Sequence, residues 1–464
     1  MVPKPRLLPL VILIVIVGWA APSVFAQDIQ VDREVGLQML EGVASRIKND
    51  YYDPNLRGFN WDQAYALTEQ RIRNARSAQE IAWHIYMLVR SLNDSHTVYL
   101  PPPTAITYTY GLTAKFHGDK LYVDELDKKG AAEKAGVKVG DRVVSILLWG
   151  QPVVFAGTRK VRTSEDLALL LALYLAAPPE LGVRILSPGE TVARFVNVKG
   201  KENARPLFKD IYKVTNIWDF IREYENWKEE NRFEIGGVRR GSDASAASEP
   251  ASGDSASSGP ARIGYIKMPH FLIDKGDSRN LISKLTDYDV LIVDLRGNPG
   301  GAVVGLLSFM GFFEPAPVDI GQQVGRKKSE PMSVKPQKPH FAGPLVVLTD
   351  SNTGSAAEVF ARHFQRQGRA KVVGDQSAGA VVVAKTHIQK VGNQYYYIYG
   401  IQVSVAQLIL PDGESLEGTG VTPDYLVIPT GEDLAQGRDP VLVKAIGVAS
   451  ELLRPKAEQA AGQK

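Results

Sequence analysis

The feature that most constrains the fold is a set of apolar segments in the second half of the chain. Val290–Leu295 and Leu345–Leu348 are almost wholly apolar, and each is followed by a stretch with a helical pattern. Strands that are hydrophobic on both faces and alternate with helices are typical of a buried, largely parallel sheet. The pattern begins near Ile263 and predicts an α/β core over residues 261–430, followed by a C-terminal helix and tail over 431–464.

The rest of the chain predicts further domains, because 464 residues exceed what one ordinary hydrophobic core accommodates. Residues 27–104 repeat apolar side chains at helical spacing and predict a helical N-terminal domain. Short strands and turns dominate residues 105–200, where we also expect a helix from Ser164 to Leu175. Residues 201–240 form a charged connecting segment, and residues 241–260 are so rich in Ser, Ala and Gly that we expect a disordered linker.

The first 26 residues have the order of a secretory signal peptide. Lys4 and Arg6 precede an apolar run from Leu7 to Ala21, and small residues follow at the cleavage positions. We therefore expect export, to the periplasm or the cell exterior, without a stable membrane span after cleavage; the alternative is an uncleaved N-terminal anchor. The chain has no Cys, which excludes a disulfide framework.

Composition also bears on the class of partner. The net charge of +3 and the lack of a long basic run do not favour nucleic-acid binding. No HExxH or comparable ligand spacing occurs, so we expect no catalytic metal, and no motif indicates a cofactor. The sequence indicates neither an oligomeric state nor a side-chain preference for a substrate.

A candidate nucleophile follows the second apolar strand. Ser355, within Asn352–Glu358, lies between Leu345–Leu348 and an amphipathic helical stretch. A helix N-terminus offers free N–H groups and favours negative charge, which suits the oxyanion formed in acyl transfer. The alternative is an ordinary N-cap serine. The glycine-rich turn Arg296–Gly301 follows the first strand and predicts further backbone N–H groups at the same sheet edge. The alternative is a plain strand-to-helix turn.

Three motifs in this order carry a family resemblance. Val293–Gly301, Gly354–Glu358 and Gly374–Gly379 resemble the C-terminal processing and tricorn-core serine peptidases. The resemblance implies a crotonase-like (ClpP-like) α/β core with an N-terminal helical domain and an inserted PDZ domain. Ala131–Val143 resembles the central stretch of bacterial PDZ domains, so Tyr110, Gly111 and Leu112 are the expected peptide-binding turn.

The resemblance also implies a catalytic set. The processing-peptidase branch places a lysine after the glycine of the third motif, but here Ala380 stands there, and Lys385 remains only as a displaced alternative base. Asn93–Thr97 and Leu416–Asp424 instead match motifs of the tricorn-like branch. By that likeness His96 is the general base for Ser355, and Ser95 links His96 to Glu417. The oxyanion hole is then formed by the N–H groups of Gly300 or Gly301 and of Ala356.

These features predict an exported serine endopeptidase that hydrolyses proteins or peptides near their C-termini through an acyl-enzyme at Ser355. Its partners would be peptides bound by their C-termini. The alternatives are a non-catalytic protein that binds peptides or apolar ligands on the same fold, and a PDZ adaptor with an inert core.

Overall fold

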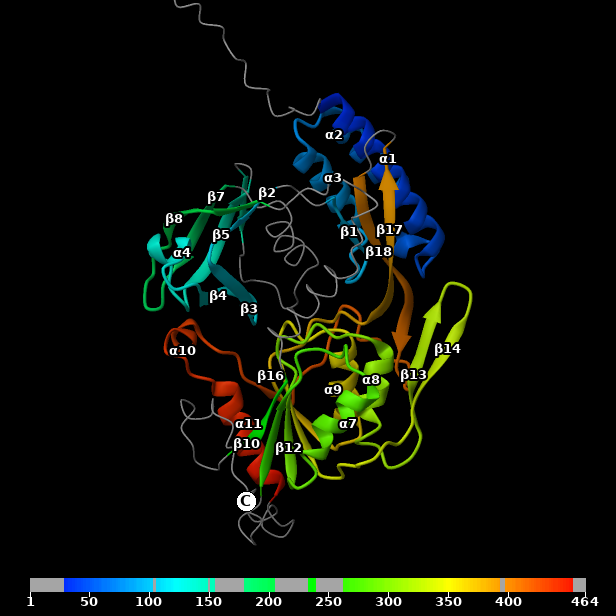
Figure 1. Cartoon of the computed structure of the whole chain (residues 1–464), viewed down its shortest axis with the longest axis vertical. Helices are drawn as coiled ribbons and strands as arrows, with labels where there is room; N and C mark the ends of the chain where they lie inside the picture. Colours follow the sequence, from blue (N-terminus) through cyan, green and yellow to red (C-terminus); the bar gives the residue numbers. More distant parts are fainter. Residues whose placement is uncertain are drawn as a thin grey trace, which may run out of the picture.

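The computed structural model describes residues 29–102, 106–148, 151–154, 179–204, 233–238, 262–392 and 397–453 (Figure 1). Several predictions from the sequence lie outside these residues: the signal segment, the helix from Ser164 to Leu175, the linker 241–260 and most of the connecting segment 201–240. Among the described residues, no helix combines the length and apolar character needed to cross a membrane.

The α/β core contains a six-stranded sheet in the order β10-β11-β12-β15-β16-β19. All neighbouring pairs are parallel except β10 with β11, which confirms the largely parallel sheet expected from the sequence. Every residue of β12 and β15 is buried. The strands are β10 (Glu234–Val238), β11 (Ile263–Lys267), β12 (Val290–Asp294), β15 (Leu345–Thr349), β16 (Ala370–Gly374) and β19 (Tyr425–Leu426).

Helices cover both faces of this sheet, which is why its strands are apolar throughout. Alternate residues along β12 enter different cores: Leu291 and Val293 pack with the α8 and α9 side, and Val290 and Ile292 pack with α11. Figure 1 shows α11 on the opposite side of the sheet from α7, α8 and α9. These helices are α7 (Lys275–Ser283), α8 (Val303–Met310), α9 (Ala356–Arg366), α10 (Gly431–Ala435) and α11 (Pro440–Leu452).

The sequence pattern predicts a helix over Ser278–Leu285, but α7 begins earlier, at Lys275. Asp274 accepts a hydrogen bond from the N–H of Asp277 at 2.7 Å and caps the helix three residues earlier. Ser278 is instead buried within the first turn and donates to the carbonyl of Asp274 at 2.8 Å. Both residue types are good caps, and only the tertiary structure selects between them.

A second sheet joins the core to the helical region. Its strands run in the order β1-β18-β13-β14, with β17 paired to β18. The long β17–β18 hairpin extends from the core to the helices, where Tyr399, Ile401 and Val403 enter the core of the helical region. The strands are β1 (Val98–Leu100), β13 (Val318–Gly325), β14 (Ser329–Val334), β17 (Val382–Val391) and β18 (Tyr397–Ile409).

The helical N-terminal region contains α1 (Ile29–Asp50), α2 (Trp61–Asn74) and α3 (Ala78–Arg90), with a short 3-10 turn at Leu56–Gly58. The sequence Ser77–Glu80 has the pattern of a capping box, and Ser77 caps α3 by accepting a hydrogen bond from the Glu80 N–H at 3.1 Å.

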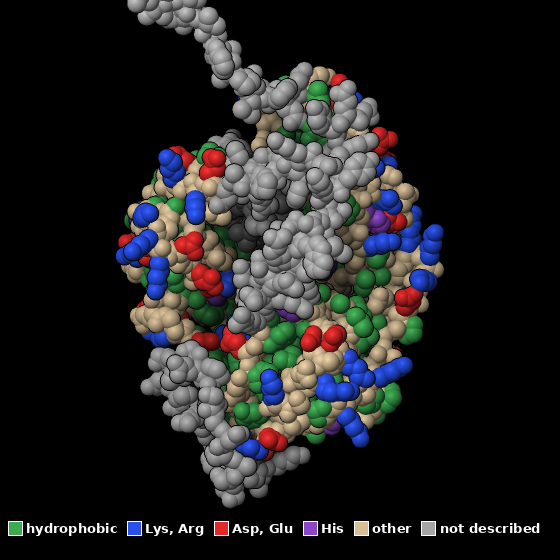
Figure 2. Space-filling model, viewed as in Figure 1, with side chains coloured by type: hydrophobic (Ala, Val, Ile, Leu, Met, Phe, Trp, Pro, Cys, Tyr) green, Lys and Arg blue, Asp and Glu red, His purple; other side chains and the backbone are tan. Residues whose placement is uncertain are grey.

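A small β domain lies beside the core (Figure 1). Its sheet has the order β3-β4-β5-β7-β8, with β6 paired to β5, and it has its own apolar core. It contacts the core where Ser351 Oγ donates to the Phe116 carbonyl at 2.7 Å and the Gly118 N–H donates to Asp375 at 2.8 Å. On the face seen in Figure 2, acidic and basic side chains are interspersed over this domain.

The elements of this region are β2 (Ile106–Thr109), β3 (Leu112–His117), β4 (Lys120–Leu126), α4 (Ala131–Lys134), β5 (Arg142–Leu148), β6 (Gln151–Val154), β7 (Glu180–Leu186), β8 (Arg194–Lys199) and β9 (Lys201–Ala204). Strands β2 and β9 pair with each other.

Candidate active site

Ser355 lies on a strained turn between β15 and α9. Its backbone has φ 53° and ψ −120°, a conformation that non-glycine residues rarely adopt. Two hydrogen bonds hold it there, because the Ser355 N–H donates to the Ala380 carbonyl at 2.8 Å and to Glu358 Oε2 at 2.9 Å. Serine nucleophiles of other hydrolases lie on comparable sharp turns between a strand and a helix.

Glu358 fastens this turn to the loop that follows β16. Its buried carboxylate accepts hydrogen bonds from Ser377 Oγ at 2.5 Å and from the N–H groups of Gly379 at 2.7 Å and Ala380 at 2.8 Å. Burial raises the pKa of Glu358 to about 7, although these donors oppose the rise. Its sequence context predicts no role for Glu358 in the site. A glutamate three residues after an N-cap serine was the available signal.

The glycine-rich turn after β12 lies directly against Ser355. A Cβ at Gly300 would lie 2.5 Å from Ser355 Cβ, so only glycine fits this approach. The Gly300 N–H is occupied, because it donates to the buried Asn298 Oδ1 at 2.8 Å. Among the described residues, the N–H groups of Gly301 and Ala356 have no hydrogen-bond acceptor. These two N–H groups are therefore available beside Ser355.

Below this turn, Arg296 connects the end of β12 to α11. Its guanidinium lies 2.6 Å from the fully buried Asp294 and 2.8 Å from Asp439. Burial opposes ionisation of Asp294, but Arg296 outweighs it and lowers the pKa of this carboxyl. Tyr265 also donates to Asp294, at 2.9 Å. The network fixes the base of the glycine-rich turn.

His96 is brought to the core from the helical region by Asp94. The Asp94 carboxylate accepts the N–H groups of His96 at 2.8 Å and Thr97 at 2.9 Å, and it accepts the hydroxyl of Ser404 on β18 at 2.7 Å. Asp94, Thr97 and Ser404 are all buried. The turn that carries His96 is thus bound to the same hairpin that leads into the site.

Ser95 bridges His96 and Glu417. Ser95 Oγ lies 2.7 Å from His96 Nδ1 and donates to Glu417 Oε2 at 2.9 Å, while the Ser95 N–H donates to Glu417 Oε1 at 3.1 Å. Because the single hydroxyl proton is used toward the carboxylate, Ser95 Oγ must accept the proton of Nδ1. His96 is therefore the tautomer with a bare Nε2, which is the form that can act as a base.

Burial is the largest influence on the pKa values of His96 and Glu417. It lowers the pKa of His96, and Arg90 adds to this effect, whereas the negative charge of Asp94 opposes it. Burial also raises the pKa of Glu417, against the hydrogen bonds donated by Val381 and Ser95. The imidazole is therefore neutral near pH 7.

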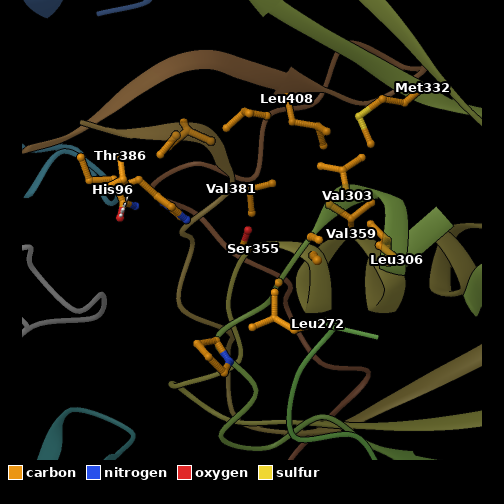
Figure 3. A pocket seen from close by; sticks show the side chains of 18 residues that line it. His96, Leu272, Val303, Leu306, Met332, Ser355, Val359, Val381, Thr386 and Leu408 are labelled. Carbon is orange, nitrogen blue, oxygen red and sulfur yellow. Dashed lines mark hydrogen bonds between the residues drawn. The ribbon is translucent and has the colours of Figure 1, made fainter. Parts of the chain in front are cut away.

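His96 and Ser355 line one cavity of about 510 Å³. Figure 3 shows Ser355 between His96 and a group of apolar side chains. Within the described residues, no direct hydrogen bond joins the imidazole to Ser355. Residues 96, 355 and 417, far apart in the sequence, are thus brought into one region.

Lys385, the alternative base, and two other residues of the same chemical types as His96 and Glu417 lie elsewhere. Lys385 is exposed, and Ala384 and Thr386 on either side of it line the cavity, so its side chain leaves the opposite face of β17. His363 pairs with Glu314 at 2.6 Å, and Glu414 pairs with Arg362 at 2.9 Å. Among the described residues, no cluster of His, Asp and Glu could hold a metal ion.

The predicted peptide-binding turn lies at the start of β3, an edge strand of the small β domain. Gly111 has φ 70°, and its carbonyl accepts the N–H of Asp127 at 3.0 Å. The Tyr110 carbonyl accepts the N–H of Ala132 at 3.0 Å. The turn thus leads into an edge strand of the sheet, and its carbonyls are hydrogen-bonded within the small β domain.

Comparisons with known proteins match this architecture. The model of peptidase family S41 matches residues 262–427. The carboxy-terminal processing protease CtpB of Bacillus subtilis (strain 168) is 22% identical over 73% of this chain and 61% of its own length. A putative tricorn protease homolog 2 of Streptomyces coelicolor is 31% identical over 41% of this chain and 16% of its own length.

Among solved structures, mature CPAF aligns with a TM-score of 0.66 at 15% identity, over 91% of this chain and 98% of that one, which is a likeness of fold. The alignments span 36%, 61% and 64% of the lengths of the first curated relatives. Residues 262–427 of this chain therefore match peptidase family S41, and the curated relatives named here are C-terminal processing and tricorn-related proteases.

Proposed function

We propose that this chain is an endopeptidase that cleaves proteins or peptides through an acyl-enzyme at Ser355, with His96 as general base. The observation that carries the proposal is the Ser95 bridge. It leaves His96 Nε2 bare, in the cavity that Ser355 also lines. Serine nucleophiles are activated by a neighbouring histidine whose tautomer is fixed by hydrogen bonding to a further acidic group.

In the proposed reaction, His96 Nε2 takes the Ser355 proton as Oγ attacks the scissile carbonyl. The oxyanion accepts the N–H groups of Gly301 and Ala356, and we assign Gly301 rather than Gly300 because Asn298 occupies the Gly300 N–H. The imidazolium then donates its proton to the departing amine. Water, deprotonated by the same nitrogen, hydrolyses the ester and releases Ser355.

Peptide capture by the small β domain is part of the proposal. The edge strand β3 and the turn Tyr110–Leu112 would bind the C-terminal segment of a substrate as an added strand. Export to the periplasm or the cell exterior is proposed on the N-terminal sequence, where Lys4 and Arg6 precede the apolar run Leu7–Ala21.

Hydrolysis of an unfolded protein substrate, followed by mass spectrometry, tests this function. Ser355→Ala and His96→Ala should each reduce kcat/KM by about 10³-fold or more. Ser333→Ala, which changes an exposed serine on β14, serves as the matched control and should leave the rate unchanged. Full proteolysis by folded Ser355→Ala would refute the proposal and favour a binding protein.

A further inference from the structure

The cavity beside Ser355 has two chemically different ends. Figure 3 shows Val303, Leu306, Met332 and Val359 on one side of Ser355, and His96 with Thr386 on the other. If the cavity holds a substrate, this asymmetry fixes which part of the peptide occupies which end. The inference below rests on the proposed function, because it uses the roles assigned to Ser355 and His96.

The apolar end is built from several separate elements. Val303 and Leu306 come from α8, Val359 from α9 and Met332 from β14. Leu306 is 1% exposed, Val359 2% and Met332 3%, so this end of the cavity is deep and shielded from solvent. No charged side chain lines the cavity among the described residues, apart from His96 when it is protonated. A charge placed here would be desolvated without a partner, which is strongly unfavourable.

The other end is polar and opens toward solvent. Thr386 and Gln402 face each other across the β17–β18 pair, with Thr386 Oγ1 3.5 Å from Gln402 Oε1. Thr386 is exposed, in contrast to the buried side chains of the apolar end. Hydrogen-bonding groups in contact with water discriminate between ligands less than a closed apolar pocket does.

The chemistry orients the peptide between these ends. The group that protonates the departing amine must lie next to it, so the leaving-group side of the scissile bond lies at His96. The acyl-side residue then points away from His96, across Ser355. We propose that the apolar end, formed by Val303, Leu306, Met332 and Val359, binds the side chain of the acyl-side residue and selects large uncharged apolar residues. The leaving-group side, at Thr386 and Gln402, accepts polar residues with little discrimination.

Matched fluorogenic peptides that differ only in the acyl-side residue test this proposal. We expect kcat/KM for Leu, Met or Phe to exceed that for Ala by at least about tenfold and that for Lys or Asp by at least about a hundredfold. Changes in the next residue should alter kcat/KM by less than about tenfold. Equal rates for Leu and Lys peptides, or a stronger dependence on the leaving-group side, would overturn the proposal.

A variant designed to reverse the preference for apolar over basic acyl-side residues provides a second test. Met332→Glu places a carboxylate in the apolar end from an edge strand, and it should raise the ratio of Lys to Leu cleavage by at least about tenfold. Met332→Gln, which has the same shape without the charge, should not raise this ratio. An unchanged ratio in folded Met332→Glu would place the acyl-side residue elsewhere.

Product binding separates this inference from the proposed function. Calorimetry on Ser355→Ala compares product peptides that end in Leu with those that end in Lys, and needs no catalysis. Tighter binding of the Leu peptide by at least about tenfold, without hydrolysis of any substrate by the wild type, would support the pocket and refute the peptidase. Hydrolysis by the wild type, with equal binding of both product peptides, would refute the pocket alone.

Discussion

Replacing Ser95 by alanine tests the bridge on which the proposed mechanism depends. The change removes the acceptor for the Nδ1 proton of His96 and the 2.9 Å bond to Glu417, while the backbone bond from residue 95 to Glu417 remains. A hydrogen bond involving a charged group contributes about 1.5–3 kcal/mol. Since about 1.36 kcal/mol corresponds to a tenfold rate change, kcat/KM should fall about 10- to 160-fold.

The assay is the pre-steady-state and steady-state hydrolysis of a fluorogenic peptide. The loss should appear in kcat, because the bridge stabilises the imidazolium that forms during acylation, and KM should change little. Ser91→Ala is the matched control, since this nearby exposed serine donates only to the Met87 carbonyl. Wild-type kcat in folded Ser95→Ala would refute the role of the bridge.

Other predictions concern charge. Because burial lowers the pKa of His96, the base form persists on acidification, and kcat/KM should fall only through a midpoint below pH 6.5. Asp94→Asn removes a charge that raises this pKa, so the midpoint measured from the pH–rate profile should move lower still. Arg296→Ala leaves the buried Asp294 uncompensated and should lower the free energy of unfolding by about 3–5 kcal/mol in urea titrations. Lys385→Ala should keep full activity in peptide assays; an inactive variant would restore the lysine-dyad alternative.

Much of the core followed from local sequence signals. Continuous apolar segments such as Val290–Leu295 identified the parallel sheet, because a strand buried on both faces has few other compositions. Ser355 and the Gly300 turn were also found locally, as each lies at the end of such a strand. The start of α7 was placed wrongly, since Asp274 and Ser278 are equally good caps in the sequence.

Residues that act through tertiary contacts could not be identified in this way. Glu358 resembles an ordinary capping glutamate, yet its carboxylate also binds Ser377, Gly379 and Ala380 from a loop after the next strand. Met332 shows no functional signal either, because it reaches the cavity only through the position of the β13–β14 hairpin. His96 was located by its likeness to a family motif, whereas its contact with the core depends on the Asp94 bonds.

The most direct test is the reaction of the purified protein with a fluorophosphonate, followed by intact-mass measurement and peptide mapping. The reagent phosphonylates only an activated serine, and the proposed mechanism predicts a single adduct on Ser355. His96→Ala should slow its formation by at least about 10²-fold. An adduct on another serine, or labelling of Ser355 at the same rate without the imidazole, would contradict the proposed mechanism.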